Sequence, residues 1–137
     1  MRYVTVSSHK DTNFTLDLSR FNIIEDADLI GRSVWEEVHS WGMFEKDTLG
    51  KQMVRAADSI SANLSEAYGR YSIPDRKRFA YIARGSLCET MNWLTKSMDR
   101  DLVNKESGQM ILVALKNLSI RLNAYIKSLH HHPDNKH

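Results

Sequence analysis

The stretch QMVRAADSISANLSEAYGR, from Gln52 to Arg70, decides how this chain is expected to fold. Its apolar residues recur every three or four positions, which is the spacing of a helix that buries one face. The row also includes one residue before the stretch and one after it. Its members are Leu49, Met53, Ala57, Ile60, Leu64, Ala67 and Tyr71. We therefore predict an amphipathic helix over about 48–71.

A row of hydrogen-bonding side chains runs along the same predicted helix, and we call it the polar file. It consists of Gln52, Arg55, Ser59, Asn63, Glu66 and Arg70. At about 100° per residue these positions fall within an arc of roughly 80° that borders the apolar face. Short amide and hydroxyl side chains beside arginine suit a tight contact better than a solvated surface. We predict that the polar file forms a structural polar network or an interface against neighbouring protein.

The next predicted helix supplies a possible partner for the polar file. The planar guanidinium of arginine suits a partly buried carboxylate, so we predict that Glu89 accepts hydrogen bonds from Arg55 or Arg70. Gly85 lies near the middle of that helix. A glycine there costs about 1 kcal/mol relative to alanine, and close approach of another backbone would explain its presence.

Helical spacing continues from Asp26 almost to the end of the chain. Ser72 and Asp75 have the spacing of a capping box, and Asn104 can cap the last helix. The predicted helices span about 26–44, 48–71, 73–98 and 104–129. Helices of this length with short connections predict an all-α fold, an up-down-up-down four-helix bundle.

The two ends of the chain differ from this pattern. The segments RYVTV and FTLDL, within residues 1–24, alternate apolar and polar residues and predict a hairpin or an extended arm. Two such strands are marginally stable alone, so an arm docked on the body or on another subunit is equally favoured. We expect three parts: an extended N-terminal arm (1–24), the bundle (25–130) and a disordered tail (131–137). The histidines that open this tail lack the spacing of a structural metal site.

The last predicted helix is apolar over a wider arc than one core contact requires. Its second apolar strip contains Met110, Val113, Ile120 and Ala124. Two explanations are open: a subunit interface, or a broad core contact with the first or third predicted helix.

The composition of the chain limits the classes of protein to which it can belong. The 137 residues carry 19 basic and 17 acidic side chains, and a net charge of +2 is no signature of nucleic-acid binding by itself. A single cysteine, Cys88, excludes an intrachain disulfide and is consistent with a reducing compartment. No apolar run approaches the roughly 18 residues of a membrane span. We expect a cytoplasmic protein without membrane contact.

Basic residues nevertheless gather around the junction of the second and third predicted helices, and we call them the basic cluster. They are Arg70, Arg76, Lys77, Arg78 and Arg84. Tyr68, Tyr71 and Tyr81 lie nearby, so the cluster could contact phosphates while aromatic rings stack on unpaired bases. The alternative is a solvated helix start, because Glu66 and Asp75 dilute the charge.

No catalytic motif is present in the sequence. There is no phosphate-binding glycine loop, no nucleophile elbow and no Glu-x-x-His pair for a di-metal bundle. We expect a protein without catalytic residues, metal or cofactor.

Two motifs at fixed spacing resemble the bacterial four-helix bundle family that includes the 23S rRNA intervening-sequence proteins. The first motif comprises Gln52, Arg55, Ala56, Ser59, Ile60, Asn63, Glu66, Gly69 and Arg70. The second comprises Phe79, Ala83, Arg84, Gly85, Ser86 and Glu89. The resemblance is good over roughly residues 49–98, with Ala67 where the family usually has glycine.

The resemblance implies a non-enzymatic bundle that assembles into a ring, often a homopentamer. Similar bundles are accessory proteins of reverse transcriptases in diversity-generating retroelements, where they engage RNA and the polymerase. We therefore expect a self-assembling scaffold associated with RNA or with a reverse transcriptase. The alternative is a purely protein-binding adaptor of a mobile-element or defence system, without nucleic-acid contact.

Overall fold

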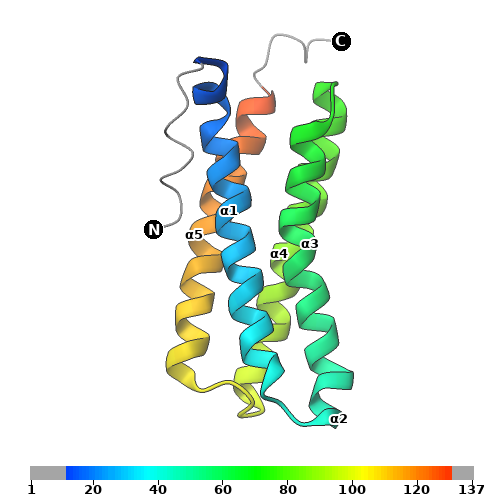
Figure 1. Cartoon of the computed structure of the whole chain (residues 1–137), viewed down its shortest axis with the longest axis vertical. Coiled ribbons are helices and arrows are strands. Elements are labelled where there is room, and N and C mark those ends of the chain that lie inside the picture. The colour runs from blue at the N-terminus through cyan, green and yellow to red at the C-terminus, as the bar shows by residue number, and fades with distance from the viewer. Residues whose placement is uncertain (1–11, 131–137) are drawn as a thin grey trace.

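The computed structural model describes residues 12–130, with side chains from residue 23 onward. Within this part of the chain the secondary structure is helical and no strand is present. Four long helices run alternately up and down (Figure 1), which confirms the all-α four-helix bundle. They are α1 (Thr12–His39), α3 (Lys51–Gly69), α4 (Ile73–Asp99) and α5 (Lys105–His130). The short helix α2 (Met43–Glu45) and the π-helical turn η2 (Lys46–Gly50) connect α1 to α3.

One face of each long helix forms the core. The apolar spacing predicted for the second helix is confirmed from Leu49 to Ala67, because every member of that row is buried. Tyr71 is the exception and is 98% exposed, because α3 ends at Gly69 and the tyrosine lies in the turn beyond it. The largest fully buried apolar side chains are Met53, Ile60, Leu87, Leu94, Leu115, Leu118, Leu122 and Val34.

Side-chain caps begin α4 and α5 where the sequence predicts them. The backbone N–H of Asp75 donates to Ser72 Oγ at 3.2 Å. The backbone N–H of Ser107 donates to Asn104 Oδ1 at 2.7 Å. Each cap satisfies a donor that has no partner within the first helical turn.

The extended arm predicted for residues 1–24 is wrong over residues 12–24, which belong to α1. No glycine or proline interrupts the chain between Thr12 and Ile30. A continuous helix therefore satisfies its backbone hydrogen bonds locally, whereas a two-stranded hairpin is marginal alone. Residues 1–11 of the arm and residues 131–137 of the tail lie outside the described residues.

Two glycines differ in what surrounds them. A Cβ on Gly50 would lie 2.7 Å from Val38 Cγ1 and 3.3 Å from the backbone oxygen of Glu45, so any larger residue there would crowd the contact of η2 with α1. A Cβ on Gly85 would meet no other atom within 4 Å. The close backbone approach predicted at Gly85 is therefore wrong within this chain, because that side of α4 faces outward.

These surroundings predict opposite effects of the same substitution. Gly85→Ala should raise the free energy of unfolding by about 1 kcal/mol, because alanine is the better helix former at an open site. Gly50→Ala should lower it by about 1–3 kcal/mol, because the added methyl overpacks the contact with Val38. Urea denaturation measures both. A loss of stability in the Gly85 variant would show that a neighbour approaches this face of α4.

Candidate functional site

The polar file runs along α3 beside its buried face. Ser59, Asn63 and Arg70 are half-buried, whereas Gln52, Arg55 and Glu66 are exposed. Asn63 Nδ2 donates to the Ser59 carbonyl oxygen at 2.8 Å, and Arg70 forms an ion pair with Glu66 at 2.9 Å. These contacts are local to α3. The interface role of the polar file therefore stays a prediction.

The bond predicted between Glu89 and Arg55 or Arg70 is wrong. Glu89 is exposed and accepts a hydrogen bond from Trp93 Nε1 at 3.1 Å. Arg70 is held by Glu66 instead. Both contacts join residues four positions apart in the chain, so neither links α3 to α4.

The basic cluster is assembled around one aromatic ring at the α3–α4 junction. The guanidinium carbons of Arg70 and Arg78 lie 4.7 Å and 4.5 Å from the centre of the Phe79 ring. Arg76 Nε donates to the Arg70 carbonyl oxygen at 2.7 Å. These contacts orient the cations while leaving parts of them accessible, since the side chain of Arg78 is 58% exposed.

The rest of the basic cluster faces α5. Arg84 lies over the Tyr81 ring, 4.9 Å from its centre, and donates to Asn123 Oδ1 at 3.0 Å. Lys77 Nζ lies 3.3 Å from His130 Nδ1, and the Tyr81 hydroxyl lies 3.0 Å from His130 Nε2. The structure thus gathers four of the five predicted residues at the α3–α4 junction and the first turns of α4, whereas Arg84 lies about three turns into α4, against α5.

Only part of this positive charge is neutralised by neighbouring carboxylates. Glu66 pairs with Arg70, and Asp75 pairs with Arg78 at 3.5 Å. In residues 23–130, Arg76, Lys77 and Arg84 form no ion pair. Tyr71 is fully exposed in the turn that precedes α4. The cations without carboxylate partners could therefore contact the phosphates of a nucleic acid, and this ring could stack on a base.

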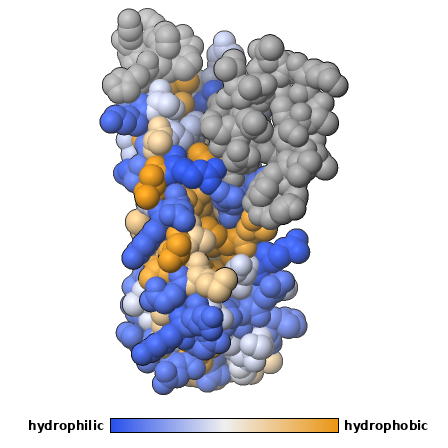
Figure 2. All heavy atoms as spheres, turned by 90° about the vertical axis from the view of Figure 1, so that its left-hand side faces the viewer, coloured by the Kyte–Doolittle hydropathy of each residue, from blue (hydrophilic) through white to orange (hydrophobic). Residues whose placement is uncertain are grey.

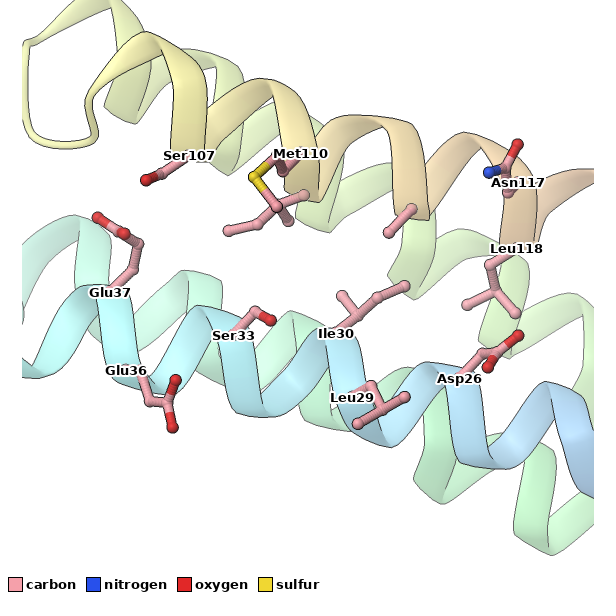
Figure 3. Close-up of a pocket in the computed structure, with 12 residues that line it drawn as sticks. Asp26, Leu29, Ile30, Ser33, Glu36, Glu37, Ser107, Met110, Asn117 and Leu118 are labelled. Carbon is pink, nitrogen blue, oxygen red and sulfur yellow. The ribbon is translucent and has the colours of Figure 1, made fainter. Parts of the chain in front are cut away.

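A groove between α1 and α5 is a second candidate site, and sequence reasoning did not find it. It has a volume of about 600 Å³, and Figure 3 shows side chains from both helices pointing into it. Asp26 of α1 and Arg121 of α5 form an ion pair near one end. Its lining includes apolar Leu29, Ile30, Met110, Ile111, Ala114 and Leu118, and acidic Asp26, Glu36 and Glu37.

The wide apolar arc of the last predicted helix was the signal for this surface. Met110, Val113 and Ile120 are 70%, 52% and 68% exposed, so α1 and α4 do not cover them. A broad core contact is therefore wrong for these three residues. Figure 2 shows hydrophobic atoms gathered in the middle of this face, between hydrophilic ones.

Other kinds of site find little support in the part of the chain that the structure describes. No three or more His, Cys, Asp or Glu side chains are placed there to hold a metal ion. Cys88 is an exposed free thiol. None of the helices there combines the length and apolar character needed to cross a membrane.

The comparison with protein families decides what the bundle is related to. The model of the 23S rRNA-intervening sequence protein family matches residues 19–124. The chain belongs to this family. The match extends from α1 to the last turns of α5, and so covers all four long helices. No curated protein matches the sequence.

The residues by which the chain resembles the 23S rRNA-intervening sequence proteins have different environments in this member of the family. Ala56, Ile60 and Ala83 are buried in the core. Arg70 and Arg84 belong to the basic cluster, and the Phe79 ring supports Arg70. A Cβ added at Gly69, as at Gly85, would meet no other atom within 4 Å. The motif therefore specifies both the helix pairing and the charged junction beside it.

Asp58 offers a pH-dependent test of the α1–α3 contact. Burial raises the pKa of its carboxyl above the ordinary value of 3.8, and the nearby charge of Asp28 raises it further. Asp58 faces α1, since a Cβ on Gly31 would lie 2.8 Å from its Oδ1. The folded state therefore binds a proton at Asp58 more readily than the unfolded state.

We predict that Asp58→Asn raises the melting temperature at pH 7. A raised pKa contributes stability that is complete below the unfolded-state pKa and is lost as the pH rises through the folded-state pKa. The advantage of the variant should therefore shrink as the pH falls to about 4. Thermal melts across this range measure it. Asp28→Asn should also stabilise, with a less than additive effect in the double variant; a pH-independent difference would contradict the assignment.

Proposed function

We propose that the chain is a non-enzymatic cytoplasmic scaffold that self-assembles and binds RNA through the basic cluster. The observation that carries this proposal is the group of cations without carboxylate partners on α4, together with an exposed tyrosine in the turn that precedes this helix. Arg76, Lys77 and Arg84 lack ion pairs within residues 23–130, and Tyr71 is 98% exposed. This is the chemistry of a surface that contacts phosphates and stacks on unpaired bases.

The cluster is suited to binding because its side chains are already oriented. Arg70 and Arg78 lie against the Phe79 ring, and Arg84 lies against Tyr81. Guanidinium groups held on aromatic rings lose less conformational freedom when they bind a ligand. Single-stranded RNA is favoured over a duplex, because Tyr71 can stack only on a base that is free of its own neighbours.

Assembly would compensate for the small charge of one copy. A net charge of +2 gives a weak electrostatic attraction for RNA. A homopentameric ring, which the family resemblance implies, would repeat the basic cluster in every copy and bind by avidity. The family is described by its relation to 23S rRNA, and this supports RNA as the class of partner. A reverse transcriptase is a further partner that the resemblance suggests.

A protein-binding adaptor of a mobile-element or defence system is the second candidate. The groove between α1 and α5 favours it, because that surface is apolar and acidic and would repel a nucleic acid. The two candidates differ in a simple property of the purified protein. An RNA-associated scaffold should carry nucleic acid that is removed by salt, whereas a protein adaptor should not.

We predict that Lys77→Glu with Arg84→Glu weakens binding of a fluorescent single-stranded RNA at least tenfold. Each lost phosphate contact should also reduce the slope of log K against log salt by about 0.7. Tyr71→Ala should cost about 1–3 kcal/mol of binding free energy with little change in this slope. Fluorescence anisotropy titrations at several salt concentrations measure both.

The control carries the same change of charge at the opposite end of the bundle. Lys51 and Lys105 are exposed and lie at the start of α3 and α5. Lys51→Glu with Lys105→Glu should bind RNA almost as the unchanged protein does. Equal losses in the two double variants would reduce the effect to net charge, and no binding at low salt would overturn RNA binding altogether.

A further inference from the structure

Two surfaces that share helix α5 are exposed although they are apolar. The first is the groove between α1 and α5. The second, which we call the ridge, is the outward face of α5 beside that groove. It consists of Val113, Lys116, Ile120, Ala124 and Lys127, all of them exposed.

The ridge is an apolar row with two lysines along one edge. At about 100° per residue, Val113, Ile120 and Ala124 fall within an arc of roughly 40°. Lys116 and Lys127 lie at one edge of this arc, and no acidic residue follows Glu106 in α5. The ridge is therefore positive as well as apolar.

The groove has the opposite charge. Apolar side chains form its floor, Glu36 and Glu37 lie on its α1 side, and no lysine or arginine lines it. Neither glutamate forms an ion pair within residues 23–130. An apolar partner with positive charge along one edge would therefore fit this groove better than an acidic or neutral one.

The two surfaces also agree in length. The groove extends along α1 from Asp26 to Glu37, and the apolar row of the ridge extends from Val113 to Ala124. At 1.5 Å per residue, each is about 16 Å long. Figure 3 shows the groove lined along this length by both helices, which suits a second helix better than a compact small molecule.

We infer that the ridge of one copy of this chain packs into the groove of the next copy. Val113 and Ile120 contact Leu29, Met110 and Ala114 of the neighbour, and the lysines of the ridge face the glutamates of its rim. This inference rests on the self-assembly in the proposed function and names the surfaces that bring it about.

The contact joins two different surfaces, so it is heterologous and can close into a ring. Around the axis of α5, the ridge and the groove-lining residues Met110 and Ala114 point in directions about 80° apart. One copy can thus hold two neighbours at an angle rather than in line. This geometry favours a closed ring over a straight filament.

The test begins with the molar mass of the unchanged protein and two single variants, measured by light scattering during gel filtration. Ile120→Glu places a negative charge on the ridge, and Met110→Lys places a positive charge in the groove. Both side chains are largely exposed, so the fold of one copy should survive, which circular dichroism checks. Each variant should lose the assembly and elute as a monomer of 15.8 kDa.

Mixing the two variants tests the head-to-tail arrangement itself. The ridge variant retains an intact groove, and the groove variant retains an intact ridge. A mixture should therefore form a one-to-one dimer through the single contact that remains. If both variants dissociate and the mixture stays monomeric, the head-to-tail contact is overturned.

Reversing the charges on both surfaces tests whether assembly depends on their attraction. Glu36→Lys with Glu37→Lys should weaken assembly, as should Lys116→Glu with Lys127→Glu. All four changes in one chain should restore it. Ile82→Glu, a 42% exposed position on α4 away from both surfaces, is the matched control and should leave the assembly intact.

The outcomes separate this inference from the proposed function. If the unchanged protein assembles but the ridge and groove variants assemble equally well, the named surfaces are wrong while self-assembly stands. If the unchanged protein is a monomer over the whole concentration range, self-assembly fails, and the inference fails with it.

Discussion

The close packing of α3 against α4 is the contact on which the rest of the bundle depends. Small buried side chains make it possible, because alanine lets two helix backbones approach more closely than leucine does. Of the pairs of long helices in contact, α3 and α4 are the most extensively packed. The buried alanines of this pair are Ala56, Ala57, Ala67, Ala80 and Ala83.

The same contact determines where charge gathers. The chain turns sharply between Gly69 and Ile73, so the end of α3 and the first turns of α4 lie together. Arg70, Arg76, Lys77 and Arg78 therefore occupy one end of the molecule, and Arg84 follows further along α4. Phe79 and Tyr81 hold three of the guanidinium groups in place. The helical hairpin of α3 and α4 is thus both a structural element of the bundle and the carrier of the candidate RNA-binding surface.

The opposite side of the bundle is packed less completely. The helices α1 and α5 are packed less extensively than α3 against α4, α1 against α3 or α4 against α5, and an acidic, apolar groove remains between them. Because α1 cannot cover Met110, and no described part of the chain covers Val113 or Ile120, one copy exposes apolar area that an assembly would bury. The basic cluster and the groove have no residue in common.

Local spacing was enough to predict the elements of this fold. The apolar row from Leu49 to Ala67 and the caps at Ser72 and Asn104 depend on residues within one or two helical turns, and each was found where expected. The basic cluster was also predictable, because its members lie within four turns on either side of a short junction. Residues 12–24 were wrongly predicted to be extended. The alternation of apolar and polar residues there covers only five positions, and it is a weaker signal than the continuation of the helix that follows.

Tertiary structure alone decided how the helix faces meet. Glu89 had a plausible arginine partner by position, yet its carboxylate is bound by Trp93 on its own helix. Gly85 could have marked a close contact, but it faces open space. The groove requires residues from α1 and α5 that are about 80 positions apart in the sequence. Sequence determines which residues share a helix face, because that depends on a fixed rotation per residue; how far two faces stand apart depends on side-chain volumes summed across the whole core.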